Sequence, residues 1–290
     1  MANEIRHVRV GGTTYDIVGR VEGVRLSVAE GDAATGTAAV ASDGTLDLSL
    51  TLPRAQGGTG GSGAATKPLA GMVVMFAGDS RFFAVTDSAS MATRMHEYAG
   101  CDVIDVVKND CTTAVSSHGS SVVAQIEGYA GAGAPDAVVI ASSINDAAYG
   151  VALGTHSDPG SEHDTSTYIG AVEHVIEYVA SKWPACRVLW VRDNRIKPPS
   201  SLGAAEASAA LAKIRQYEAA LEAERADYGF EWVDFQVPQL NGTIPAVRER
   251  YFTNADNPGV QGYSGDGIHP NRDGHLVMAR IIAAVLAPGR

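Results

Sequence analysis

Two different hydrophobic patterns divide the chain near residue 70. Before that point, hydrophobic and polar residues alternate in short stretches, for example over residues 6–10 and 45–52. Alternation with a period of two, bounded by Gly-Gly and Asp-Gly, is typical of short, half-buried strands. We therefore predict a small β-rich module over residues 1–52. A linker dense in glycine follows at residues 53–70.

Beyond residue 70, continuous hydrophobic runs alternate with segments of helical periodicity. Such runs indicate strands that are buried on both faces, and a parallel connection between them needs a crossover long enough for a helix. We therefore predict that residues 71–290 form an α/β fold, a three-layer α/β/α sandwich around a parallel sheet. The predicted strands are residues 72–77, 103–107, 137–141, 187–191 and 231–235, and the predicted helices are residues 121–129, 167–182, 204–227 and 273–286.

The overall composition narrows the possible partners. Hydrophobic residues make up 45% of the chain, enough for a buried core, and the formal net charge is -11. This acidic balance disfavours a nucleic-acid partner, which requires clustered Lys and Arg. No hydrophobic run reaches the length of a membrane span, and residues 1–10 lack the hydrophobic centre of a signal peptide. We therefore expect a soluble protein without a conventional secretion signal.

The three cysteines, Cys101, Cys111 and Cys186, are an odd number and contain no Cys-x-x-Cys pair. Each lies in or beside a predicted strand of the large domain. We predict buried free thiols rather than a disulfide or a metal site.

Three polar clusters lie where predicted strands end or where the last predicted helix begins. Residues 78–80 follow the first strand of the sheet, Asn145 follows the third, and Asp266 and His269 precede the last helix. Because ligands of open α/β sheets bind beyond the carboxyl ends of the strands, we expect the three clusters to converge on one rim.

These residue types together suit acyl transfer. The hydroxyl of Ser80 becomes a nucleophile once a base such as His269 takes its proton, and Asp266 would orient the imidazole and stabilise its cation. The Asn145 amide and the Ser80 backbone N–H would stabilise the developing oxyanion. Each motif alone has a structural explanation, as a tight turn, a helix N-cap or a helix start. Their joint occurrence in this order favours a hydrolase.

The order Gly-Asp-Ser, Asn-Asp and Asp-x-x-His resembles the SGNH/GDSL hydrolase family over residues 71–290. The resemblance implies a flavodoxin-like sheet and cleavage of esters, thioesters or carbohydrate O-acetyl groups without a metal or organic cofactor. Residue by residue, it implies Ser80 as nucleophile, His269 as base, Asp266 as its partner, Asn145 as an oxyanion donor, and Gly78 and Asp79 as structural residues beside the site.

The chain departs from the family pattern at three places. Arg81 stands where the family usually has Leu, and Ser143 stands where it usually has Gly. Residues 108–114 contain no glycine, although the family has one there whose N–H completes the oxyanion hole. The backbone N–H of Ala114, or of a neighbour, is then the candidate third donor.

The loop at residues 147–166 follows Asn145 directly and is expected to form one wall of the substrate cleft. We predict substrate contacts from Tyr149 and His156. The loop also carries several acidic and histidine residues, but it lacks His-Glu-x-x-His spacing, so we predict a solvated loop and no metal. For His118, a position on a surface loop is favoured over a substrate contact.

Residues 51–60 resemble joints in bacteriophage tail-fibre and baseplate proteins, and residues 7–19 resemble the opening of some phage structural proteins. A generic glycine-rich linker is the alternative. The resemblance implies a phage virion or prophage-encoded tail component, a homotrimer assembled through the N-terminal module, and a host polysaccharide as substrate.

Taken together, the sequence predicts a metal-independent serine esterase that removes short acyl groups, acetyl in particular, from an acylated small molecule or polysaccharide. Carbohydrate O-deacetylation through an acyl-enzyme is the leading hypothesis. A lipase- or thioesterase-like member of the family is one alternative, which a long apolar groove would favour. A catalytically inactive tail protein is the other, and the missing glycine is its best support.

Overall fold

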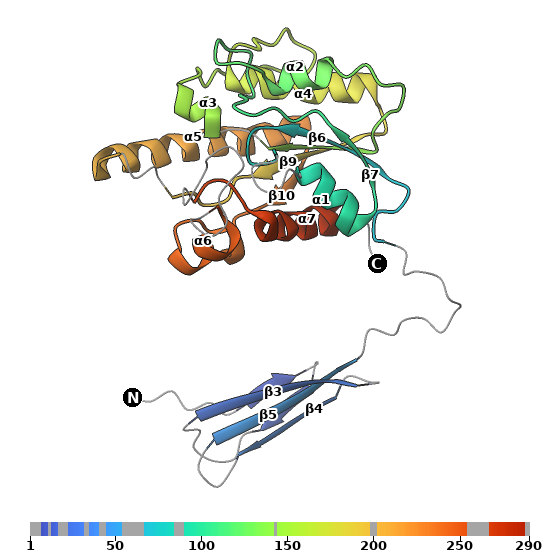
Figure 1. Ribbon diagram of the computed structural model, residues 1–290, viewed down its shortest axis with the longest axis vertical. Helices are drawn as coiled ribbons and strands as arrows, with labels where there is room; N and C mark the ends of the chain where they lie inside the picture. The colour runs from blue at the N-terminus through green and yellow to red at the C-terminus, as the bar shows by residue number, and fades with distance from the viewer. Residues whose placement is uncertain are drawn as a thin grey trace. The chain divides into compact units, whose positions relative to one another are not determined.

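The computed structural model describes residues 67–83, 90–141, 144–197, 202–253 and 267–287, together with the backbone of five strands before residue 54. The chain divides into two compact units, residues 1–66 and 67–290 (Figure 1). Most of the predicted linker, Ser143 and Asp266 lie outside the described residues.

In the first unit, the described strands form two sheets. Antiparallel strands β1 and β2 make one, and β3, β5 and β4 make the other, in which β3 and β5 are parallel and β4 is antiparallel. Of the two alternating segments, residues 7–10 fall on β1 and residues 45–52 fall on β5. The bounds are β1 His7–Val10, β2 Thr13–Asp16, β3 Gly23–Gly31, β4 Thr35–Val40 and β5 Thr45–Pro53.

In the second unit, five parallel strands form one sheet in the order β7-β6-β8-β9-β10. Numbered along the unit, this order is 2-1-3-4-5, and the predicted parallel α/β sheet is confirmed. The strands are β6 Val73–Gly78, β7 Asp102–Asp105, β8 Ala137–Ala141, β9 Arg187–Arg192 and β10 Glu231–Asp234.

Helices cover both faces of this sheet (Figure 1). Helices α1 and α7 pack into the core on one face, and α2, α4 and α5 pack into the core on the other. The helices are α1 Met91–Ala99, α2 Val122–Glu127, α3 Ile144–Tyr149, α4 Tyr168–Lys182, α5 Ala204–Tyr228, α6 Pro245–Tyr251 and α7 Arg272–Leu286, and a 3-10 turn spans Pro238–Leu240. Within the described part of the chain, no helix is both long and apolar enough to cross a membrane.

Burial on both faces explains why the central strands are continuously hydrophobic. On β6, Val74 and Phe76 face the layer of α1 and α7, whereas Met75 and Ala77 face the layer of α2, α4 and α5. Successive side chains of a strand point to opposite faces, so each position must be apolar when both faces are covered. This packing fixes the carboxyl ends of β6 and β8, where the candidate site lies.

Three helices were not predicted from the sequence. Helix α1 begins after the N-cap Ser90 and buries Arg94, so its hydrophobic stripe is interrupted. Helices α3 and α6 are six and seven residues long. Because α3 starts almost directly after β8, Asn145 lies in a first helical turn and not on an open loop.

The cysteine side chains are free thiols. Cys101 and Cys111 are buried, and Cys186 is partly buried. Burial raises the pKa of Cys186 to about 12 and also raises the pKa of Cys111. Since the thiolate is the reactive form, these cysteines act as small hydrophobic residues.

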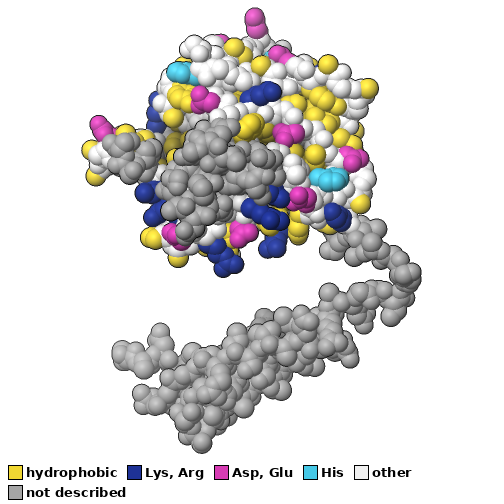
Figure 2. Space-filling view, in the orientation of Figure 1, with side chains coloured by type: hydrophobic (Ala, Val, Ile, Leu, Met, Phe, Trp, Pro, Cys, Tyr) yellow, Lys and Arg dark blue, Asp and Glu magenta, His cyan; other side chains and the backbone are white. Residues whose placement is uncertain are grey.

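The outer surface mixes side chains of different kinds. On the face drawn in Figure 2, acidic, basic and hydrophobic side chains are interspersed over the described residues.

Candidate active site

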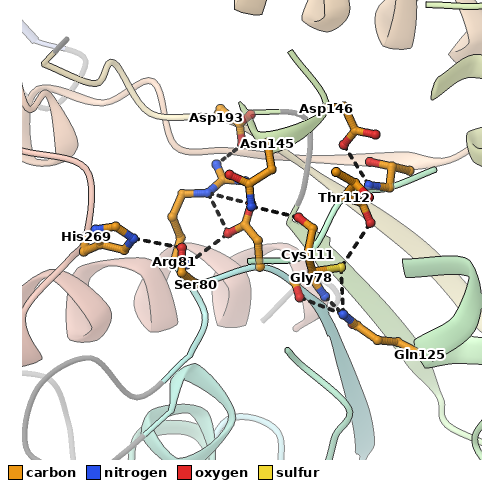
Figure 3. A network of polar contacts seen from close by, with 12 residues as sticks. Gly78, Ser80, Arg81, Cys111, Thr112, Gln125, Asn145, Asp146, Asp193 and His269 are labelled. Atoms are coloured by element: carbon orange, nitrogen blue, oxygen red, sulfur yellow. Dashed lines mark hydrogen bonds and ion pairs between the residues drawn. The ribbon is translucent and has the colours of Figure 1, made fainter. Parts of the chain in front are cut away.

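The turn that carries Ser80 is built on a glycine at the end of β6. Gly78 has a φ of 141°, and a Cβ atom there would lie 2.2 Å from the carbonyl oxygen of Ala141 on β8. Gln125 of α2 clamps this glycine: its side-chain oxygen accepts from the Gly78 N–H at 2.8 Å, and its amide donates to the Gly78 carbonyl at 2.9 Å (Figure 3). The turn is therefore held on both sides of one residue. This role of Gln125 was not predicted from the sequence.

Ser80 and His269 meet at this rim although 189 positions separate them. The distance between Ser80 Oγ and His269 Nε2 is 2.8 Å, a hydrogen bond (Figure 3). The backbone of His269 is fixed as well, because its carbonyl accepts from the N–H of Thr253 at 3.0 Å. This pairing fits a catalytic triad. Asp266, the predicted third member, lies outside the described residues.

Asn145 and Asp146 tie helix α3 to the loop after β7. The Asn145 amide donates to the carbonyl of Cys111 at 2.8 Å, and Asn145 also lines the cavity beside Ser80. The fully buried Asp146 carboxylate accepts from the backbone N–H groups of Thr113 and Ala114 at 2.7 and 3.1 Å. Burial raises the pKa of Asp146 to about 6, although these bonds oppose the shift.

This geometry corrects the expectation for Ala114. Its N–H was the candidate third oxyanion donor, but it is engaged by Asp146 Oδ1, and Ala114 is not among the residues that line the cavity. From the same loop, Asn109 and Asp110 line the cavity, and Asp110 has a left-handed φ of 58°.

Behind the nucleophile, Arg81 links two carboxylates in a buried ion cluster. Its guanidinium donates to both oxygens of Asp79, with the shortest contact at 2.8 Å. It also donates to Asp193 in the loop after β9 (Figure 3). All three side chains are at most 3% exposed. His275 of α7 also hydrogen-bonds the Arg81 carbonyl at 2.8 Å. A buried charge needs such partners, and Asp79 and Asp193 provide them for Arg81.

A cavity of about 620 Å³ lies beside Ser80 and His269. Its walls come largely from α3 and the first half of α5, and many of the lining side chains are aliphatic, such as Ile144, Leu211 and Ile214. Lys213 and Tyr149 add polar groups.

Tyr149 lines this cavity, whereas His156 does not. The Tyr149 hydroxyl donates to Asp110, and its ring stacks on His118 with 4.4 Å between ring centroids. His156 instead lies beside Glu224 and Glu173, away from the cavity lining. The geometry therefore does not support the predicted substrate contact of His156. The prediction of a solvated loop is also wrong at His163. Its side chain is 3% exposed because it packs against Glu173.

A serine hydroxyl bonded to an imidazole, at the carboxyl rim of an α/β/α sandwich, defines a class of serine hydrolases. The chain belongs to the GDSL-like Lipase/Acylhydrolase family, whose model matches residues 76–277. It is therefore a serine carboxylic ester hydrolase.

Solved structures share this fold at low sequence identity. A protein from Lactobacillus plantarum is 21% identical with a TM-score of 0.57, covering 75% of this chain and 97% of that chain. A possible lipase from Chitinophaga pinensis is 16% identical with a TM-score of 0.53, covering 74% and 97%. Phospholipase A1 from Streptomyces albidoflavus is 14% identical with a TM-score of 0.50, covering 74% and 99%. A comparison with curated proteins gives no match.

Proposed function

We propose that this chain is a metal-independent serine esterase in which Ser80 is the nucleophile, His269 the general base and Asp266 its orienting partner. The observation that carries the proposal is the 2.8 Å hydrogen bond between Ser80 Oγ and His269 Nε2. This is the contact through which the proton of the serine must pass.

The reaction then proceeds in two steps. Ser80 Oγ attacks the ester carbonyl while His269 Nε2 accepts its proton, and the imidazolium returns that proton to the departing alcohol. Water, deprotonated by the same imidazole, then hydrolyses the acyl-enzyme. The Ser80 N–H and the Asn145 amide are the oxyanion donors, and the bond from Asn145 to the Cys111 carbonyl holds that amide in place.

For the acyl group, we propose a short chain, acetyl in particular, carried by a small molecule or a polysaccharide. A second candidate is a longer acyl chain, and the aliphatic lining of the cavity favours it. A volume of about 620 Å³ lies in the range that holds a whole drug-sized ligand, so an acetyl group fills only a small part of it. On the first hypothesis, the alcohol or sugar occupies the remainder.

The test is hydrolysis of p-nitrophenyl acetate, butyrate and octanoate by the wild-type protein and by Ser80→Ala, with a chelator in every reaction. We expect kcat/KM to fall at least about 10³-fold in the variant, because the nucleophile is lost. The exposed Ser181→Ala in α4 is the matched control and should retain full activity. Equal rates in wild type and Ser80→Ala would overturn the proposal. A preference for octanoate over acetate would select the longer acyl chain.

A further inference from the structure

A second cluster of ionisable side chains lies between α4, α5 and the loop that precedes α4. The Nδ1 atom of His156 is 2.7 Å from Glu224 Oε2 and 3.3 Å from Glu173 Oε1. One ligand atom from each of the three side chains lies within 4.8 Å of the other two. Glu173 is fully buried and Glu224 is 4% exposed, whereas the His156 side chain is 39% exposed. The cluster is therefore preformed and reachable from one side.

The charges of this cluster are poorly balanced. Among the described residues, the basic side chains within 4 Å of the two buried carboxylates are His156 and His163. Further carboxylates surround these imidazoles at 3.2 to 3.9 Å, from Glu177, Asp158 and Asp227. Two buried carboxylates close together need positive charge beside them, which a metal ion held by these three ligands would supply.

We propose that His156 Nδ1, Glu173 and Glu224 bind a divalent transition-metal ion such as Zn²⁺. Two ligand atoms about 2.0 to 2.1 Å from a tetrahedral zinc lie about 3.3 Å apart. The distance from His156 Nδ1 to Glu173 already has this value, and the distance to Glu224 must widen by only about 0.6 Å. Water completes the coordination on the exposed side of His156.

The surroundings hold one of the three ligands in place. Glu173 Oε1 accepts from the Ser157 N–H at 2.7 Å, and Glu173 Oε2 accepts from the Ser157 hydroxyl at 2.5 Å and lies 3.1 Å from His163 Nδ1. The Tyr228 hydroxyl in turn donates to the Ser157 carbonyl at 2.7 Å. Outer partners of this kind orient metal-binding carboxylates and limit their reorganisation on binding.

The donor set also selects the kind of metal. An imidazole nitrogen with two carboxylates suits zinc and similar ions, whereas Mg²⁺ and Ca²⁺ prefer oxygen ligands throughout. The bound ion would tie the loop after Tyr149 to helices α4 and α5. His156 does not line the cavity, so the metal has a structural function and takes no part in ester cleavage.

The experiment uses the full chain, stripped with a chelator and then titrated with ZnCl₂ by calorimetry. Thermal unfolding is followed with and without Zn²⁺, and with Mg²⁺ for comparison. We expect one Zn²⁺ per chain and a rise in Tm of about 5–10 °C at a free Zn²⁺ concentration of 100 Kd, with no comparable rise for Mg²⁺.

His156→Ala and Glu224→Gln should each abolish this rise. The matched control is His174→Ala, which removes a histidine that pairs with Glu127 outside the cluster. Folding of each metal-free variant is checked by its ester hydrolysis. Absence of a Tm rise in the wild type, or an equal rise in wild type and His156→Ala, would overturn the proposal. Ser80→Ala should bind Zn²⁺ normally, so failure of the esterase proposal and failure of the metal proposal are distinguishable.

Discussion

At the scale of single residues, Gly78 sets the geometry of the nucleophile. Its positive φ and its 2.2 Å approach to the Ala141 carbonyl exclude any side chain at this position. Gln125 then uses both ends of its amide on the same residue, so the turn has little freedom to relax. The bond from Ser80 to His269 depends on this rigidity, because it joins two elements far apart in the sequence.

We predict that Gly78→Ala lowers the free energy of unfolding by roughly 2–4 kcal/mol, since the new methyl group meets a backbone oxygen in a conformation that alanine rarely adopts. Urea unfolding followed by circular dichroism measures the change. The control is Gly133→Ala, where nothing lies within 4 Å of the added Cβ, and its midpoint should stay close to wild type. Equal midpoints for the two variants would show that the turn relaxes easily.

At the scale of elements, the sequence predicted the parts whose signals are local. The five strands of the sheet and helices α2, α4, α5 and α7 were predicted from hydrophobic pattern, because both faces of the sheet are buried. Helix α1 was missed because the buried Arg94 interrupts its apolar stripe, and α3 because six residues are too short for periodicity.

Contacts between elements leave no local signal in the sequence. They account for the residues of the site that were not predicted. The roles of Gln125 and Asp193 arise from loops and helices that meet only in the folded chain. Ala114 was misjudged for the same reason, since the partner of its N–H comes from α3.

Where α5 meets the segment after β10, Glu218 provides a pH-dependent contribution to stability. It accepts from the Gln236 amide at 3.3 Å, and burial, with a further contribution from Asp193, raises its pKa to about 7. The unfolded chain has a lower carboxyl pKa, so the folded state holds an extra proton between roughly pH 4.5 and 7. Stability from this group is therefore present at low pH and is lost as the pH rises through that window.

We predict that Glu218→Gln raises the free energy of unfolding at pH 8 by about 1–2 kcal/mol relative to wild type, with a much smaller gain at pH 5. Chemical unfolding at the two pH values measures the difference. The exposed Glu162→Gln is the control and should show the same change from wild type at both pH values. An equal effect of Glu218→Gln at pH 5 and pH 8 would contradict a carboxyl group that stays protonated near neutral pH.

At the scale of the whole molecule, the candidate active site and the N-terminal strands belong to different units of the chain. The described residues of the candidate active site and the proposed metal site all lie in the unit of residues 67–290. That unit has a hydrophobic core on each face of its own sheet. Such a unit has what it needs to fold by itself. The first unit pairs its own strands in two sheets. Assembly of several chains through this unit stays a prediction from its sequence.

We therefore predict that a fragment of residues 67–290 folds and hydrolyses p-nitrophenyl esters with kcat/KM within about twofold of the full chain. Light scattering coupled to gel filtration should give a monomer for this fragment and three times the mass of one chain for the full-length protein. The two readouts separate the two claims. An inactive but folded fragment would mean that the first unit contributes to the site, whereas a monomeric full chain would remove the trimer and, with it, the strongest physical consequence of the tail-fibre resemblance.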